Sequence, residues 1–215
     1  MPTTVTKIVA SSGGDYTSLN GWNAGEAANL VTLEQIRQAD CRNFVDTTAV
    51  AFDGAFVTDA TRYYRIFAFD NHNGLYGTSS YRLEATAKQE IEFKTVSTRV
   101  DARIEGILIT AIGDGVDAST GIVAEHLTTT GSIRVEQVLC KRSGDALIGE
   151  MFRGFVSTGL NATTIFANCL AYDFNPTIAD GTGFVQDTPT TYFYNCGCHN
   201  SDTGFNSADT NGWAK

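Results

Sequence analysis

The segment FANCLA at Phe166–Ala171 can be laid over three other segments of the chain. They are IEGILI at Ile104–Ile109, VEQVLC at Val135–Cys140 and FYNCGC at Phe193–Cys198, with starts 31, 31 and 27 residues apart. A second motif follows each copy, namely Gly121-Ile122, Gly154-Phe155, Gly183-Phe184 and Gly204-Phe205. Two motifs that recur in phase indicate an internal repeat of about 30 residues.

The repeat is built of short apolar runs rich in β-forming residues and separated by Gly, Asn and Asp. Helical repeats of similar length have long runs with a period of 3.6 residues, which this chain lacks. A unit of this kind cannot bury a core alone, so successive units must stack. The pattern therefore predicts an all-β fold, a single parallel β-solenoid whose coils lie about 4.8 Å apart.

The part of the chain before the repeats is less regular. Residues 63–69, 81–84 and 91–94 alternate apolar and polar side chains and are predicted as strands of the first coils. Leu19 and Trp22 lie on one face of a short predicted helix, which would cover the apolar end of the stack. We therefore expect an N-terminal arm with a capping helix over 1–30 and a β-helix over 31–215.

Composition excludes some classes of partner. The chain has 215 residues, a net charge of −9 and a pI of about 4.7, so it is poorly suited to bind nucleic acid. No run approaches the roughly 18 apolar residues of a membrane span, so no membrane partner is expected. The N-terminus lacks the pattern of a secretion signal, and five cysteines are an odd number. These features predict synthesis in a reducing cytoplasm rather than a disulfide framework.

The opening Gly13-Gly-Asp-Tyr-Thr-Ser-Leu19, with Trp22 and the later Asn-Cys and Gly-Phe motifs, resembles right-handed parallel β-helix proteins. That group includes pectate-lyase-like enzymes, bacterial surface proteins and many virion proteins of tailed phages. The resemblance implies a right-handed parallel β-helix. Its motifs are architectural, so it implies little about activity.

The repeat gives another meaning to YNCGCHN at 194–200, which taken alone could be half of a metal site. Aligned copies place its cysteines in two apolar columns: Ile107, Val138, Cys169 and Cys196, and Ile109, Cys140, Ala171 and Cys198. A free cysteine packs as a small hydrophobe, so we interpret both columns as a ladder in the solenoid core. A zinc site would need two more ligands, and no matching CxxC or HxxxH pair occurs, so no metal or cofactor is expected. Stacked coils would also allow a Cys169–Cys196 disulfide, which the expected compartment does not favour.

Two further columns have structural interpretations. Asn168 and Asn195 could exchange side-chain hydrogen bonds between coils. Leu108, Leu139 and Leu170 have the opposite parity to the cysteines, so they would form an outward apolar stripe suited to an oligomer interface. The reverse assignment of the two faces stays open.

The candidate catalytic residues do not converge. Glu105 and Glu136 share a column, but at a separation of one coil they are interpreted as solvated surface residues. We therefore expect a non-catalytic structural protein, a phage capsid decoration or cement protein made in the host cytoplasm. It would bridge major capsid protein subunits as a homotrimer. The alternatives are a glycan-binding or glycan-cleaving β-helix, like a tailspike or polysaccharide lyase, and a fragment of a bacterial surface adhesin.

Overall fold

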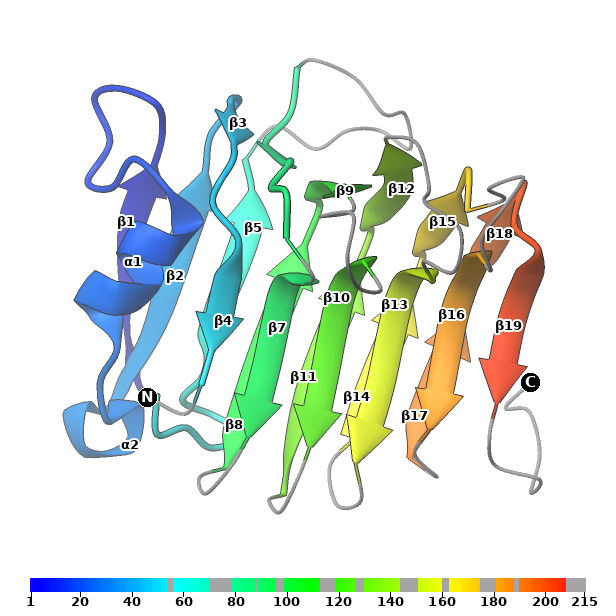
Figure 1. Ribbon diagram of the computed structural model, residues 1–215. Helices are drawn as coiled ribbons and strands as arrows, with labels where there is room; N and C mark the ends of the chain where they lie inside the picture. The colour runs from blue at the N-terminus through cyan, green and yellow to red at the C-terminus, as the bar shows by residue number, and fades with distance from the viewer. Residues whose placement is uncertain are drawn as a thin grey trace.

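The computed structural model describes residues 1–53, 56–69, 79–87, 89–95, 99–112, 119–126, 130–143, 151–159, 163–174, 181–187 and 190–207. These residues form three parallel sheets and two short N-terminal helices (Figure 1). Sheet 1 contains β1 (Thr3–Val9), β2 (Gln35–Cys41), β5 (Tyr64–Ala68), β8 (Val100–Glu105), β11 (Gly131–Glu136), β14 (Thr163–Ala167) and β17 (Thr191–Tyr194). Sheet 2 contains β3 (Val45–Asp46), β6 (Arg82–Leu83), β9 (Leu108–Ile112), β12 (Leu139–Ser143), β15 (Leu170–Tyr172) and β18 (Gly197–His199). Sheet 3 contains β4 (Val50–Phe52), β7 (Gln89–Thr95), β10 (Ser119–His126), β13 (Phe152–Gly159), β16 (Gly181–Asp187) and β19 (Thr203–Ser207).

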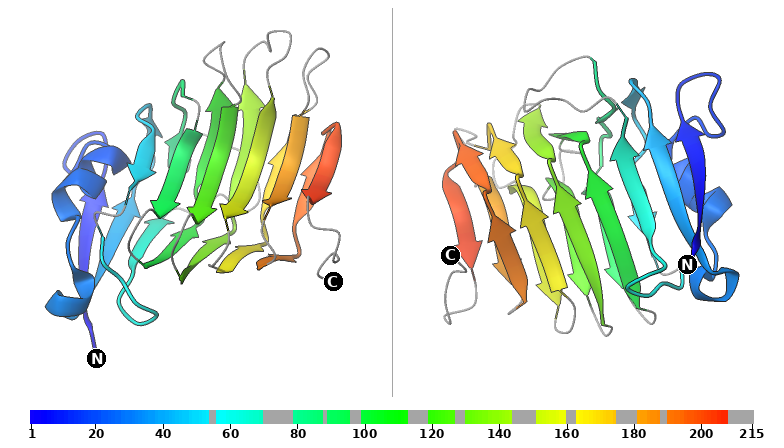
Figure 2. Two further views of the ribbon diagram at one scale, coloured as in Figure 1. Left: turned by 60° about the horizontal axis from the view of Figure 1, so that its bottom comes forward. Right: turned by 180° about the vertical axis from the view of Figure 1, so that it is seen from behind.

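Each turn of the chain adds one strand to each sheet, so the molecule is a parallel β-solenoid. Five turns lead from β2 to β17, through β5, β8, β11 and β14. Figure 2 shows the sheets running side by side along the whole stack, with the helices at the N-terminal end. The predicted β-solenoid fold with a short N-terminal helix is confirmed.

The aligned motifs lie directly over one another in the stack. In sheet 1 the register pairs Ile104 with Val135, Val135 with Phe166, and Phe166 with Phe193. In sheet 3 the phenylalanines of the second motif stack almost face to face: 4.8 Å separates the ring centroids of Phe155 and Phe184. Equivalent apolar side chains of successive turns therefore stack on one another in the core. This stacking explains why the sequence repeats.

The corner between sheets 1 and 2 has the same backbone conformation in four successive turns. Gly106, Gln137, Asn168 and Asn195 all have φ between 50° and 70°. Asparagine and glycine adopt this left-handed conformation more readily than other residues. The Asn195 side chain also donates a 2.8 Å hydrogen bond to Asn168 Oδ1, as the sequence predicts.

The N-terminal end of the stack is covered by α1 (Leu19–Glu26), which is followed by α2 (Leu30–Leu33). Ser18 caps α1 by accepting a hydrogen bond from Gly21 N. Trp22 is fully buried and stacks on Phe56, with 5.9 Å between their ring centroids. β1 pairs with β2 as the first strand of sheet 1.

Candidate functional site

The strands of sheet 1 can be followed in the right-hand view of Figure 2, and three of them carry an arginine at the same register position. Arg65, Arg103 and Arg134 are in register on β5, β8 and β11. Their neighbours in the strands, such as Ile104 and Val135, are fully buried in the core, so the arginines face outwards. The outer face of sheet 1 therefore presents three stacked cations.

Two of the three arginines are neutralised by carboxylates of the next outward column. Arg65 forms a two-point ion pair with Glu105, in which its Nε lies 2.9 Å from Oε1. Arg134 donates to Glu136 over 2.6 Å, and this hydrogen bond lowers the pKa of Glu136. Glu105 and Glu136 share a column, as the sequence predicts, but each carboxylate is held by its own arginine.

Arg103 is the exception in this row. Its guanidinium lies 4.0 Å from the centre of the Tyr63 ring, and among the described residues it makes no ion pair within 4.0 Å. A guanidinium that stacks on an aromatic ring still has its edge N–H groups free to donate to a carboxylate or phosphate. Arg103 is thus the cation of the row that is best placed to bind a ligand.

A pocket of about 230 Å³ lies beside Arg103. It is lined by Ala60, Tyr63, Asp101, Ala102, Arg103, Ser132, Arg134 and Ile165. The charged residues of this lining are two arginines, Arg103 and Arg134, and one carboxylate, Asp101, which is paired with Arg99. The pocket therefore has a local excess of positive charge on a chain of net charge −9, which favours an anionic ligand.

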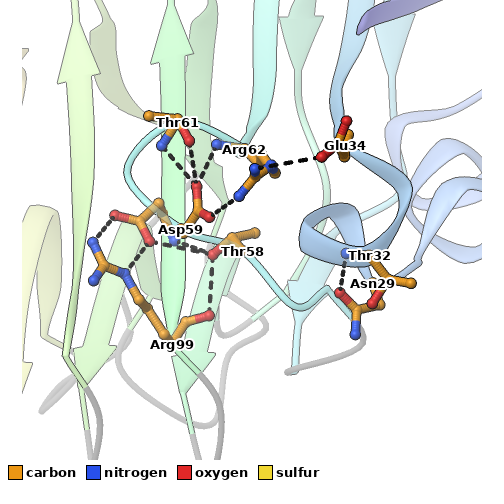
Figure 3. A network of polar contacts seen from close by, with 9 residues as sticks. Asn29, Thr32, Glu34, Thr58, Asp59, Thr61, Arg62 and Arg99 are labelled. Carbon is orange, nitrogen blue, oxygen red and sulfur yellow. Dashed lines mark hydrogen bonds and ion pairs between the residues drawn. The ribbon is translucent and has the colours of Figure 1, made fainter. Parts of the chain in front are cut away.

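The rim of the pocket is a turn at 58–63 that is held by polar contacts (Figure 3). Asp59 accepts hydrogen bonds from the backbone N–H groups of Thr61 and Arg62, both at 2.8 Å, and from the Arg62 guanidinium at 2.6 Å. Burial alone would raise the pKa of Asp59, but the hydrogen bonds from Thr61 and Arg62 lower it to about 2. Asp59 is consequently ionised at neutral pH and fixes the turn.

A second set of contacts ties this turn to β8. Thr58 Oγ1 accepts a 2.6 Å hydrogen bond from Asp101 N and donates to the Arg99 carbonyl at 3.0 Å. Arg99 in turn pairs with the Asp101 carboxylate at 2.6 Å (Figure 3). Because the rim is bonded on both sides, the pocket is formed before any ligand binds.

The repeat itself contains a signal for this arginine row. Arg103 and Arg134 directly precede the first residues of two aligned motifs, Ile104 and Val135. Because side chains alternate along a strand, the position one residue before a core column faces outwards. A charged residue repeated at that offset marks an outer column.

The predicted cysteine columns lie in the solenoid interior in the expected register. β9, β12, β15 and β18 pair Ile109 with Cys140, Cys140 with Ala171, and Ala171 with Cys198. The column members before the last turn are at most 2% exposed: Ile107, Val138, Cys169, Ile109, Cys140 and Ala171. Cys196 and Cys198 are only half-buried, contrary to the expectation of full burial, because they lie in the last turn of the described stack.

The predicted leucine stripe needs a correction. Leu108, Leu139 and Leu170 are in register in sheet 2, as expected. However, Leu108 is 0% and Leu139 is 4% exposed, so they do not form an exposed apolar surface. The alternation of a strand indicates the direction of a side chain but not whether other residues cover it. Only Leu170, which is partly exposed, offers apolar surface at this register position.

The thiols of the last turn donate hydrogen bonds to backbone carbonyls. Cys198 Sγ lies 2.9 Å from Gly204 O, and Cys196 Sγ lies 3.3 Å from Phe166 O. No group of three or more His, Cys, Asp or Glu side chains is arranged to hold a metal ion in the described part of the chain. None of the helices formed by the described residues has the length and apolar character needed to cross a membrane.

The class defined by these features is a parallel β-solenoid with a charged and aromatic outer face on sheet 1. No family model, no curated protein and no solved structure matches the chain.

Proposed function

We propose that the protein is a non-catalytic structural protein that decorates and reinforces a phage capsid as a homotrimer. The supporting observation is the continuity of its columns, in which hydrogen-bonded strands and stacked side chains run from turn to turn without a break in register. Such a body is stiff along its axis, because each turn is bonded to the next over three sheets. A stiff body that bridges capsid subunits would resist outward pressure.

The contact between subunits would use the C-terminal end of the outer face of sheet 1. Tyr192 and Tyr194 on β17 are 39% and 51% exposed, and their rings stack 6.3 Å apart. Ile165 precedes Tyr192 in the same outward column. Exposed tyrosines are enriched in protein interfaces, since they bury a large area with little loss of side-chain freedom.

The acidic charge of the chain supports a basic surface as the capsid partner. A net charge of −9 on 215 residues would steer the protein towards such a surface on the major capsid protein. In this proposal the protein is made in the host cytoplasm and functions in the virion.

The test of the trimer is the mass of the purified protein, measured by sedimentation equilibrium over a range of concentrations. We expect about three times the chain mass of 23.1 kDa, and we expect the double substitution Y192A/Y194A to yield monomers. F69A is the matched control, because Phe69 is 61% exposed but lies outside this surface. A wild-type monomer at all concentrations, or dissociation by F69A as well, would count against the proposed contact.

A second function, the binding of an acidic glycan, is favoured by one observation. Arg103 lines a preformed pocket with Tyr63 and Ser132, and it makes no ion pair within 4.0 Å among the described residues. A carboxylate of a sugar could occupy its free N–H groups. Calorimetric titration with uronic-acid oligosaccharides and neutral ones would test this, with R103A expected to abolish binding of the acidic set only. An assay for new reducing ends or unsaturated products would show whether the bound glycan is cleaved.

A further inference from the structure

Cys169 and Cys196 occupy equivalent positions in the last two turns, just after the corner between sheets 1 and 2. The turns are bonded at this place: Gly197 N donates to Cys169 O over 3.0 Å, and Leu170 pairs with Gly197. Neighbouring strands in a sheet lie about 4.8 Å apart, and a disulfide spans Cα separations of about 4.4–6.8 Å. The two cysteines are therefore at a separation that a disulfide can bridge.

The pair is reached from an open depression of about 330 Å³. The depression is lined by Leu139, Asn168, Cys169, Leu170, Asn195, Cys196 and Gly197. Cys196 is half-buried, whereas Cys169 is 2% exposed. A small reagent in the depression thus meets Cys196 first, and Cys169 is the adjacent thiol in the preceding turn.

Each of the two thiols also shifts the pKa of the other. A hydrogen bond from Cys169 lowers the pKa of Cys196, while burial and the same contact raise the pKa of Cys169. Cys198 is similarly half-buried two residues later, but burial raises its pKa to about 12. Because the thiolate is the nucleophile in thiol chemistry, Cys196 and Cys198 should differ strongly in rate despite similar exposure.

We propose that Cys196 and Cys169 form a reactive dithiol, which low-molecular-weight disulfides oxidise to a disulfide that joins the last two turns. In the first step Cys196 Sγ attacks one sulfur of the reagent R–S–S–R, and one thiolate R–S⁻ leaves and takes up the proton lost by Cys196. In the second step Cys169 loses its proton, attacks Cys196 Sγ of the mixed disulfide and releases the second R–SH. Two cysteine thiols are oxidised and one reagent disulfide is reduced to two thiols.

The Cys169–Cys196 disulfide would link the last described turn covalently to the turn before it. In the last turn the core side chains Phe193 and Phe205 are only partly buried, and the described chain continues no further than Ser207. A covalent link between turns restricts the opening of β17 and β18. Oxidation would therefore protect the C-terminal end of the solenoid.

The experiment follows the folded protein with excess 2,2′-dithiodipyridine, and then with glutathione disulfide, by thiol release and intact mass. We expect two reagent thiols to be released rapidly per chain, and a product that carries no adduct and has lost two hydrogens. Peptide mapping should show a Cys169–Cys196 link. After denaturation of the reduced protein, all five cysteines should react.

Three variants separate the roles of the cysteines. C169S should stop at a stable mixed disulfide on Cys196, C196S should lose the rapid phase, and C198S should behave as wild type. Hydrogen exchange in β17 and β18 should slow after oxidation of the wild-type protein and stay unchanged in C196S. Equal rates at Cys196 and Cys198, or a wild-type product that retains its adduct or forms cross-linked dimers, would overturn the proposal. The wild-type product decides the question even if a variant fails to fold.

Discussion

The two ends of the solenoid have the same kind of interior but different surroundings. At the first end α1 lies over the stack, and Leu19 and Trp22 are both 0% exposed. In the last turn Phe193 and Phe205 occupy equivalent core columns but are only partly buried. The comparison shows that a repeated apolar residue becomes a core residue only where something covers both of its sides.

The two ends are also held together in different ways. Near the first end Asp46 accepts hydrogen bonds from Leu19 N at 2.6 Å and from Tyr81 Oη at 2.8 Å, which joins α1 to two turns. Near the last end like residues stack on one another, as Phe184 does on Phe205, with 4.8 Å between their ring centroids. The first turns are thus stabilised by specific hydrogen bonds between unlike residues. The last turns are stabilised by stacking of like residues from successive repeats.

The largest effect is expected for Trp22 at the covered end. W22A would leave a cavity among Phe52, Phe56 and Tyr64, and it should lower the free energy of unfolding by about 3–5 kcal/mol. F205A should lower it by about 1–2 kcal/mol, because the ring of Phe205 is already partly in solvent. Urea unfolding, monitored by far-UV circular dichroism, measures both free energies. This signal does not depend on the tryptophan that W22A removes. Equal losses would mean that the last turn is covered as well as the first.

The features that could be predicted from the sequence are those that repetition encodes. The register of Val135, Phe166 and Phe193 follows from aligned residues of the same kind, and so does the Asn168–Asn195 hydrogen bond. The helix over Trp22 was predictable because its apolar residues share one face.

Features that depend on contacts between distant and unlike residues could not be predicted. The bond of Asp46 to Leu19 joins residues 27 positions apart that no motif relates. The burial of Leu108 depends on what covers an outward side chain, and no periodicity encodes that. The pocket at Arg103 likewise requires the turn at 58–63 to fold over β8 through Thr58 and Asp101.

One of the earlier turns contains a buried carboxyl group, that of Glu90. The described residues of the last turns contain none. Glu90, in β7, is 0% exposed, and burial raises the pKa of its carboxyl from 4.5 to about 8. Among the described residues, its carboxylate accepts hydrogen bonds from Ala85 N at 3.0 Å and Ile112 N at 3.4 Å. Because the pKa is higher in the folded state, the folded protein binds the proton more tightly than the unfolded chain does. The resulting stabilisation is complete below about pH 4.5 and is lost as the pH rises through 8.

The substitution E90Q removes the titratable carboxyl group of Glu90. Relative to wild type, E90Q should gain stability progressively between about pH 5 and pH 9, by up to about 4 kcal/mol. Unfolding free energies measured across that range give the difference. D187N is the matched control, because it makes the same carboxylate-to-amide change at an exposed residue of β16. Parallel profiles for E90Q and wild type would contradict the assignment of the buried acid.

The smallest effect comes from the glycines of the second motif and compares an inner turn directly with the last one. A Cβ at Gly154 would lie 2.6 Å from Gly183 O and 3.0 Å from Ala171 Cβ, so the backbone of the next turn would have to move. A Cβ at Gly204 would meet only Cys198, at 3.6 Å and beyond, which is ordinary contact. We expect G154A to lower the free energy of unfolding by about 1–3 kcal/mol.

G204A should be neutral, or stabilising by up to about 1 kcal/mol, since alanine restricts the unfolded chain and the φ of Gly204 is not positive. Thermal and urea unfolding of both variants provide the measurement. If G204A were as damaging as G154A, another part of the molecule or a second subunit would have to pack on the last turn. The glycine pair therefore reports whether the C-terminal end is open in solution, and repeating the measurement above and below the concentration for trimer formation would show whether assembly closes it.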